Sequence, residues 1–328
     1  MESLIFIMPF KLIIQLALVS FVVLGKTSTG TATPKPSSTY ATFADWCRNE
    51  AKLPKETQFT IAVLLKMANT LDCNQADEHL SSASSLDLTD SKVADLSPLR
   101  SLTQLRQLYL GNNRITNIEP LESLTDLTHL YLSYNQLSDI RGLSKLTNLN
   151  YLFLSSNQIK DISGLQPLKQ LQGLDLVSNQ ISNLEPLKTL PNLTRLDISF
   201  NKIKDISPLQ ALVNLQELSL SAQQVADIRP LNALTNLVHL DLSGNQISDL
   251  TSLQPLTNLI SLGLGGNRIA DITPLKSLFR LNALYLSGNQ IKTLKPLATL
   301  KNLESLYIQG NPLASEACPV QPASICRF

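Results

Sequence analysis

The sequence predicts one elongated α/β solenoid, although its 328 residues would be long enough for two globular domains of ordinary size. Three observations lead to this prediction. An asparagine recurs every 22 residues, apolar residues recur at fixed positions between the asparagines, and the apolar spacing inside each unit changes from strand-like to helix-like. A unit of this size cannot bury its own apolar face, so neighbouring units must stack into one continuous core.

The recurring asparagine defines the register of the units. It occupies Asn113, Asn135, Asn157, Asn179, Asn201, Asn245, Asn267, Asn289 and Asn311. At the intervening position the residue is Gln223. A side-chain amide at this place can bond backbone groups that the turn after each strand leaves unpaired, so we expect the stacked units to carry a hydrogen-bonded Asn ladder. We interpret Gln223 as a tolerated irregularity in that ladder.

Each unit should contain one strand, one turn and one short return segment. In the second unit Leu108 and Leu110 flank an outward position, as in a half-buried strand, whereas Ile118 and Leu121 are three residues apart, as in a tight helical turn. Seven units carry a proline at the same place, which suits the first residue of a helical turn, and an aspartate is common three residues earlier. We interpret both residue types as structural.

The pattern LxxLxLxxN followed by xIxDIxPLxxLxx resembles leucine-rich repeats with 22-residue units, as in bacterial internalins and a eukaryotic regulator of protein phosphatase-1. The resemblance covers about residues 83–311, which hold ten full units and a partial eleventh. It implies a leucine-rich repeat horseshoe with a parallel β-sheet on the concave face and 3-10 or irregular segments on the convex side. It says little about function, because one fold hosts many functions.

Both ends of the repeat array are expected to be capped. Residues 41–82 carry apolar side chains at intervals of three and four residues, which predicts two short helices whose apolar face includes Phe59, Met67 and Leu71. Residues 312–328 are expected to form the C-terminal cap. A solenoid needs such caps because its terminal units would otherwise expose the core.

The cysteines lie outside the repeats, in one pair for each cap. The pairs are Cys47 with Cys73 and Cys318 with Cys326. We expect each pair to form a disulfide if the protein is exported, and free thiols if it stays in a reducing cytosol. A zinc site is the weaker alternative, because the chain has no CxxC motif and no histidine near either pair.

The N-terminal residues 1–25 contain the longest apolar run, Leu12 to Leu24, and resemble a secretory signal peptide. A retained membrane anchor is the alternative, but the run is short for a membrane span. Residues 26–40 are rich in Ser, Thr and Pro, which predicts a disordered linker. We therefore expect a secreted protein, or one of the cell envelope or periplasm, that contacts membranes only if the first segment is uncleaved.

Composition and motifs argue against several function classes. The net charge of +1, without a Lys or Arg run, argues against nucleic-acid binding. Two of the three histidines, His129 and His239, occupy equivalent strand positions five units apart, or about 24 Å at ~4.8 Å per strand, so they cannot share a catalytic site. No hydrolase, phosphate-loop or dinucleotide motif is present. We expect no enzyme activity, no catalytic residue, no cofactor and no metal site.

The positions that flank the central strand leucine should point outward from the concave face, and they are sorted by chemistry. Aromatic residues gather toward the N-terminal half, namely Tyr109, Tyr131, Tyr151 and Phe153. Acidic residues occupy the middle, namely Asp175, Asp197, Glu217 and Asp241. Two tyrosines, Tyr285 and Tyr307, lie at the far end, and His129, Arg195 and His239 complete the candidate partner-binding residues.

Clustered exposed aromatic residues favour a binding surface, because tyrosine is enriched at interface hot spots. The alternative is that the rings pack on their cross-strand neighbours without any partner. The leading hypothesis is an exported bacterial interaction module that binds a protein partner on the concave face. The second is a glycan or cell-wall binding protein that uses the same face, and the third is a cytosolic scaffold like the phosphatase regulator.

Overall fold

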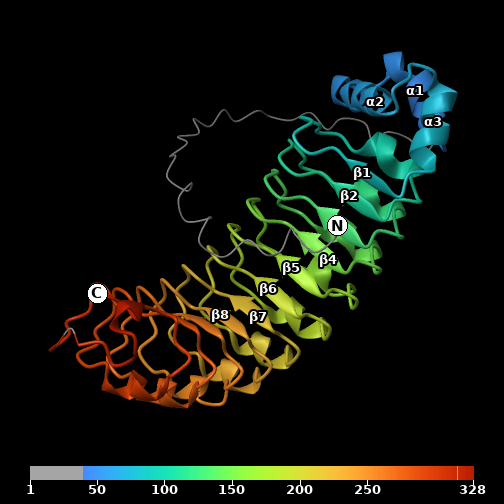
Figure 1. The fold of residues 1–328 in the computed structure, drawn as a ribbon. Coiled ribbons are helices and arrows are strands. Elements are labelled where there is room, and N and C mark those ends of the chain that lie inside the picture. The colour runs from blue at the N-terminus through green and yellow to red at the C-terminus, as the bar shows by residue number, and fades with distance from the viewer. Residues whose placement is uncertain (1–39, 316) are drawn as a thin grey trace, which may run out of the picture. The chain divides into compact units, whose positions relative to one another are not determined.

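The computed structural model describes residues 40–315 and 317–328, which form a curved solenoid of stacked coils (Figure 1). The predicted signal peptide or anchor, and the predicted linker except its last residue, lie outside the described residues. That last residue, Tyr40, packs its ring on Trp46 with the ring centroids 4.8 Å apart and so adjoins the cap. Within the described part, no helix is long and apolar enough to span a membrane.

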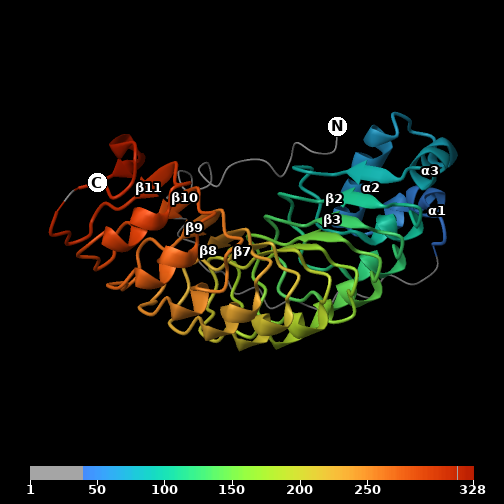
Figure 2. The ribbon, with the colours of Figure 1, turned by 60° about the horizontal axis from the view of Figure 1, so that its bottom comes forward.

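The coils contribute one strand each to a twelve-stranded parallel sheet whose spatial order follows the sequence. The strands are β1 (Ser85–Asp87), β2 (Gln107–Tyr109), β3 (His129–Tyr131), β4 (Tyr151–Phe153), β5 (Gly173–Asp175), β6 (Arg195–Asp197), β7 (Glu217–Ser219), β8 (His239–Asp241), β9 (Ser261–Gly263), β10 (Ala283–Tyr285), β11 (Ser305–Tyr307) and β12 (Cys326–Arg327). Residues 22 apart pair directly, as Leu108 does with Leu130. Figure 2 shows the strands along the inner side of the curve, so the predicted solenoid with a concave parallel sheet is confirmed.

Short 3-10 helices form the outer side of the curve (Figure 2). They are η2 (Ser97–Ser101), η3 (Glu119–Ser123), η4 (Arg141–Lys145), η5 (Ser163–Leu165), η6 (Glu185–Thr189), η7 (Ser207–Ala211), η8 (Arg229–Ala233), η9 (Thr251–Leu253), η10 (Thr273–Ser277) and η11 (Lys295–Thr299). The repeated aspartate starts seven of these ten turns, as Asp95 Oδ1 accepts the Ser97 N–H at 2.9 Å, and Asn117, Asn183 and Thr293 take its place in the others. Pro98 is therefore the second helical residue and not the first, because a proline at the first position would lack the N–H that the aspartate binds.

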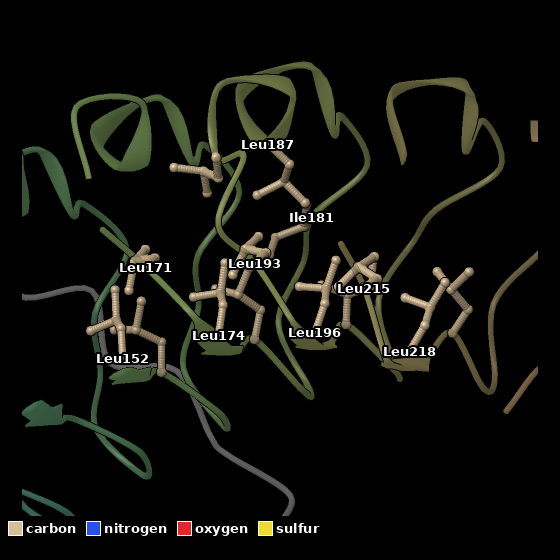
Figure 3. Packing of buried hydrophobic residues seen from close by; sticks show 14 of the residues in the cluster. Leu152, Leu171, Leu174, Ile181, Leu187, Leu193, Leu196, Leu215 and Leu218 are labelled. Carbon is tan, nitrogen blue, oxygen red and sulfur yellow. The ribbon is translucent and has the colours of Figure 1, made fainter. Parts of the chain in front are cut away.

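The apolar positions of every unit face one interior. In the second unit they run from Leu105 to Leu124 and are no more than 2% exposed. Figure 3 shows this packing for the central coils, where the strand leucines Leu152, Leu174, Leu196 and Leu218 form one row and Leu171, Leu193 and Leu215 form the next. Because each coil covers the side of its neighbour, the core is continuous from the N-terminal cap to Val320.

The ladder asparagines lie inside the turn that follows each strand. Asn179 donates from Nδ2 to the Leu154 carbonyl of the preceding coil at 3.0 Å and to the Leu176 carbonyl of its own coil at 3.1 Å. Its Oδ1 accepts the Ile159 N–H at 3.0 Å. Equivalent bonds are made by Asn113, Asn135, Asn157, Asn201, Asn245, Asn267, Asn289 and Asn311.

Gln223 retains both bonds that link its coil to the preceding one. Its Nε2 donates to the Ile198 carbonyl at 2.6 Å, and its Oε1 accepts the Ile203 N–H at 3.0 Å. The bond to its own strand, which Asn179 makes to Leu176, has no counterpart in the described contacts of Gln223. The longer side chain therefore replaces asparagine without opening the stack, as expected for a tolerated irregularity.

The N-terminal cap contains three α-helices among its described residues, one more than predicted. They are α1 (Phe43–Arg48), α2 (Lys55–Met67) and α3 (Cys73–Ser81), with the 3-10 turn η1 (Glu50–Lys52) between α1 and α2. The Cys47–Cys73 disulfide joins α1 to the start of α3, with the Cα atoms 5.7 Å apart. Phe43, Trp46, Ile61 and Leu64 fill the cap core that adjoins the first coil.

The predicted apolar face of the cap was wrong at three residues. Phe59, Met67 and Leu71 are 44%, 38% and 88% exposed, respectively. Leu64, which the same spacing also placed on the apolar face, is fully buried, and helix α2 packs through the face that carries Leu64 together with Ile61. Spacing by three and four residues is satisfied by more than one face of a helix, so only packing decides which face lies inside.

The C-terminal cap extends the sheet by a strand that the sequence did not predict. The Cys318–Cys326 disulfide, with the Cα atoms 5.8 Å apart, lies beside η12 (Ala323–Ile325), and β12 pairs with β11. The Ile308 N–H donates to the Arg327 carbonyl at 3.0 Å, and Ile308 is 1% exposed. A two-residue strand has no periodicity to detect, because its pairing depends on the neighbouring strand and not on its own sequence.

Candidate binding surface

Two rows of stacked rings cover the concave side of β2, β3 and β4. In the first row Tyr131 stacks between Tyr109 and Phe153, with ring centroids 4.4 and 4.5 Å apart. In the second row His129 stacks on Tyr151 at 5.0 Å. Parallel pairing places equivalent residues side by side, so aromatic residues 22 apart must stack. These side chains are half-buried, so the rings pack on one another as well as facing the concave side.

Gly173 lets the aromatic cluster continue over β5. A β-carbon at this position would lie 2.7 Å from Cδ1 of Tyr151, which is closer than side chains tolerate. The Tyr151 hydroxyl donates to Oε1 of Gln172 at 3.4 Å. On the same strand, Asp175 pairs in register with Phe153, so the aromatic cluster ends directly beside a carboxylate.

Asp175 and Asp197 are neighbours in register on β5 and β6. Each accepts a backbone N–H two residues further on, Asp175 from Val177 at 2.9 Å and Asp197 from Ser199 at 3.0 Å. Burial raises the pKa of Asp175 to about 6, and the neighbouring charge of Asp197 adds to this effect. The hydrogen bond from the Val177 N–H acts in the opposite direction and lowers the pKa. Burial also raises the pKa of Asp197. A cation bound beside these carboxylates would stabilise their ionised forms.

The remaining acidic residues do not extend this carboxylate pair as the sequence suggested. Glu217 forms an ion pair with Arg195, with Nε and Oε1 3.1 Å apart. Ser219 separates Asp197 from Asp241, and its buried hydroxyl bonds the Ser199 hydroxyl at 2.6 Å. Among residues 40–315 and 317–328, no ion pair involves Asp175 or Asp197. β5 and β6 therefore carry two adjacent carboxylates that make no ion pair in the described chain.

The far end of the sheet carries a separate aromatic pair. Tyr285 and Tyr307 stack with centroids 4.9 Å apart, and the Arg327 guanidinium lies 5.4 Å from the Tyr307 ring centroid. The cap strand β12 thus covers part of this pair, and His239 lies exposed on β8 between the two aromatic groups. The structure places the predicted site residues on one sheet but separates them into an N-terminal aromatic–acidic surface and a C-terminal tyrosine pair.

The histidines lie on three separate elements, with His79 on α3, His129 on β3 and His239 on β8. No group of three or more His, Cys, Asp or Glu in the described part of the chain could hold a metal ion. The concave surface itself presents ring faces, hydroxyl groups and one pair of adjacent carboxylates.

A second row of asparagines lies at the amino edge of the sheet and was not recognised in the sequence. It consists of Asn148, Asn192, Asn214, Asn236, Asn258 and Asn302, each of which donates from Nδ2 to a backbone carbonyl 23 residues earlier at 2.8 to 3.0 Å. Three of them line an open groove of about 520 Å³ together with Gln172, Thr194 and Gln216. Their 22-residue recurrence is the signal that could have found them.

Comparison with protein families agrees with this geometry. The model for leucine-rich repeats in two copies matches residues 84–123, 125–167, 169–211, 213–255 and 279–317. The chain belongs to the leucine-rich repeat family. A search of curated proteins finds no match for this leucine-rich repeat protein.

Solved structures include relatives of this leucine-rich repeat protein. An internalin (inlF) from Listeria monocytogenes is 35% identical over 80% of this chain and 79% of that chain, with a TM-score of 0.74. The ectodomain of the plant receptor kinase GASSHO1/SCHENGEN3 from Arabidopsis thaliana, in complex with Casparian strip integrity factor 2, is 25% identical over 72% of this chain and 34% of that chain, with a TM-score of 0.60. The fold is internalin-like, and the family resemblance drawn from the sequence is confirmed.

Proposed function

We propose that this leucine-rich repeat protein is an exported, non-enzymatic bacterial module that binds a protein partner on its concave sheet. The observation that carries the proposal is the aromatic cluster of Tyr109, Tyr131 and Phe153 beside the carboxylates of Asp175 and Asp197. Stacked rings are already ordered, so a partner that covers them gains apolar contact at little further loss of side-chain freedom. The related receptor ectodomain, solved with a bound factor, supports a protein ligand.

Export is supported by the two disulfides and by the apolar N-terminal sequence, because disulfides persist in oxidising compartments. We expect the protein from its native host to lack about the first 25 residues and to gain the mass of four hydrogens on reduction. Intact-mass measurement of each cell fraction, with and without reductant, checks this. A full-length chain with four free thiols in the cytosolic fraction would instead support the scaffold hypothesis.

The concave surface is tested with peptides selected from a random phage-displayed library against the full chain. We expect Tyr131→Ala combined with Phe153→Ala to weaken peptide binding about tenfold or more, because it removes two of the three rings in the first row. The loss of ring stacking should lower the free energy of unfolding by only about 1–2 kcal/mol. Affinity is measured by titration, and folding by thermal denaturation.

The matched control is Tyr285→Ala. It removes one ring of the pair at the far end of the sheet, where Tyr285 stacks on Tyr307. This variant loses one stacked pair where the double variant loses two, so it should lose less stability, and it should keep its affinity for the selected peptides. Unchanged binding by the Tyr131 and Phe153 double variant would mean that the cluster serves packing alone.

A glycan ligand is the second candidate. The groove at the amino edge is lined by uncharged amide and hydroxyl groups, which can bond sugar hydroxyls, and Tyr151 bonds Gln172 at its border. Retention of the full chain on insoluble polysaccharide, together with a loss of retention in Gln216→Ala, would favour this candidate over the protein partner.

A further inference from the structure

The residue before each ladder asparagine, and the one before Gln223, adopts a left-handed backbone conformation. In the last four coils this residue is glycine, at Gly244, Gly266, Gly288 and Gly310, with φ between +64° and +70°. In earlier coils it is Asn112, Tyr134, Ser156, Ser178, Phe200 or Ala222, with φ between +54° and +58°. Glycine suits this conformation, and asparagine tolerates it, whereas a bulky aromatic residue there is an outlier.

The neighbouring coils hold Tyr134 and Phe200 in this conformation. The Tyr134 N–H donates to the Ser155 carbonyl at 2.8 Å, and the Phe200 N–H donates to the Ser221 carbonyl at 3.0 Å. The Gly244 N–H makes the equivalent bond to the Gly265 carbonyl of the following coil. The repeat geometry therefore sets a positive φ at this position whatever residue occupies it. A side chain here brings its β-carbon toward the following carbonyl and destabilises the fold relative to glycine.

Burial does not compensate for this strain. Tyr134 is 65% exposed and Phe200 is 53% exposed. Glycine would therefore be the less strained residue at both positions, where most of each ring faces solvent. Strained residues that the fold does not require are candidates for contact with another molecule.

Phe200 lies in the same coil as Asp197, and Tyr134 lies two coils before the coil of Asp175. Tyr134 follows β3, three residues after Tyr131, and Phe200 follows β6, three residues after Asp197. They lie on the carboxyl edge of the sheet, three coils or about 14 Å apart at ~4.8 Å per strand. At the two coils between them the equivalent residues are the small Ser156 and Ser178.

We propose that an extended segment of the partner protein crosses the carboxyl edge of the sheet between β3 and β6, with apolar side chains on Tyr134 and Phe200 and a lysine or arginine toward Asp175 and Asp197. We assign a basic residue to the partner because the two carboxylates are adjacent and neither forms an ion pair within the described chain. A lysine or arginine of the partner would supply the complementary charge. This inference rests on the proposed function and extends its surface from the inner face to the edge.

The test uses Tyr134→Gly and Phe200→Gly, alone and combined, in the full chain. Relief of strain should raise the thermal midpoint by about 2–4 °C for the combined variant. The same variant should bind the library-selected peptides about tenfold more weakly, because both edge rings are gone. Stability and binding are thus expected to change in opposite directions, which loss of folding cannot produce.

Ala222→Gly is the matched control. Ala222 has the same backbone conformation, at φ +54°, but carries only a methyl group. Its replacement should also raise the thermal midpoint and leave peptide affinity unchanged. The selected peptides should carry lysine or arginine together with bulky apolar residues, and their affinity should fall as salt concentration rises.

The outcomes separate the two proposals. If the combined glycine variant keeps its affinity while the Tyr131 and Phe153 double variant loses it, the concave surface stands and the edge site is wrong. A fall in the thermal midpoint of the glycine variants would mean that the edge rings stabilise the fold, which also overturns the inference. Acidic peptides, or a library that yields no binder, would count against the basic partner segment.

Discussion

Asn179→Ala is expected to lower the free energy of unfolding by about 3 kcal/mol. The change removes a buried side chain that bonds backbone groups in two coils. The Leu154 carbonyl would keep its bond from Asn157, but the Ile159 N–H would lose the acceptor that the structure shows. A buried donor without a partner costs about 1–3 kcal/mol, and the lost bonds add to this. The midpoint of urea unfolding at neutral pH measures the effect.

Asn192→Ala provides the control, since it removes the same side chain from the opposite edge of the sheet. Asn192 is exposed and makes one side-chain bond, from Nδ2 to the Lys169 carbonyl at 2.9 Å. Water can replace that bond, so we expect a loss of no more than about 1 kcal/mol. Equal losses in the two variants would show that the buried ladder contributes no more than a surface hydrogen bond.

Asp175→Asn is expected to stabilise the protein at neutral pH by about 2 kcal/mol. The fold raises the pKa of Asp175 to about 6, mainly through burial, so the folded state favours the protonated carboxyl group. Protonation of Asp175 stabilises the folded state fully below about pH 4, which is the pKa of this group in the unfolded chain. That stabilisation is lost as the pH rises through about 6, which is its pKa in the folded protein. Asparagine is neutral throughout, and its side-chain oxygen can still accept the Val177 N–H. The gain should therefore appear at pH 7.5 and vanish below pH 4.

Asp227→Asn should show the opposite sign. Arg229 bonds the Asp227 carboxylate, with Nη2 and Oδ2 2.6 Å apart, and lowers the pKa of Asp227 to about 2. This carboxylate contributes stability above the unfolded pKa of about 4, and that contribution is lost as the pH falls through about 2. The Asp227→Asn variant should thus be slightly less stable than the parent at pH 7.5, by an amount that solvent screening keeps small. Unfolding midpoints at pH 4 and pH 7.5 compare both variants.

The stabilising effect expected of Asp175→Asn bears on binding. A carboxylate that reduces the stability of the free protein at neutral pH is useful if a partner supplies the compensating positive charge. The variant should then gain stability and lose affinity for the library-selected peptides, as expected for the edge glycine variants. The carboxylate of Asp175 and the edge rings of Tyr134 and Phe200 would thus each lower the stability of the free protein and raise its affinity for the partner.

Much of the candidate surface could be predicted from the sequence because parallel pairing in register places residues 22 apart side by side. The stacking of Tyr109 on Tyr131 follows from that rule. The acidic middle was predicted less well, since Arg195 neutralises Glu217 and Ser219 interrupts the row. These contacts depend on how side chains lean across strands, which residue spacing does not define.

By itself, the sequence determined the solenoid, its register and the positions of its buried leucines, because a strict 22-residue period leaves one way for each coil to bury its apolar face. The tertiary structure alone decided the third cap helix, the strand β12, the partial burial of Asp175 and the left-handed conformation of Tyr134 and Phe200. Each of these features is imposed by a neighbouring element. Periodicity specifies which side chain points inward, whereas burial and backbone strain depend on what the adjacent coil places beside it.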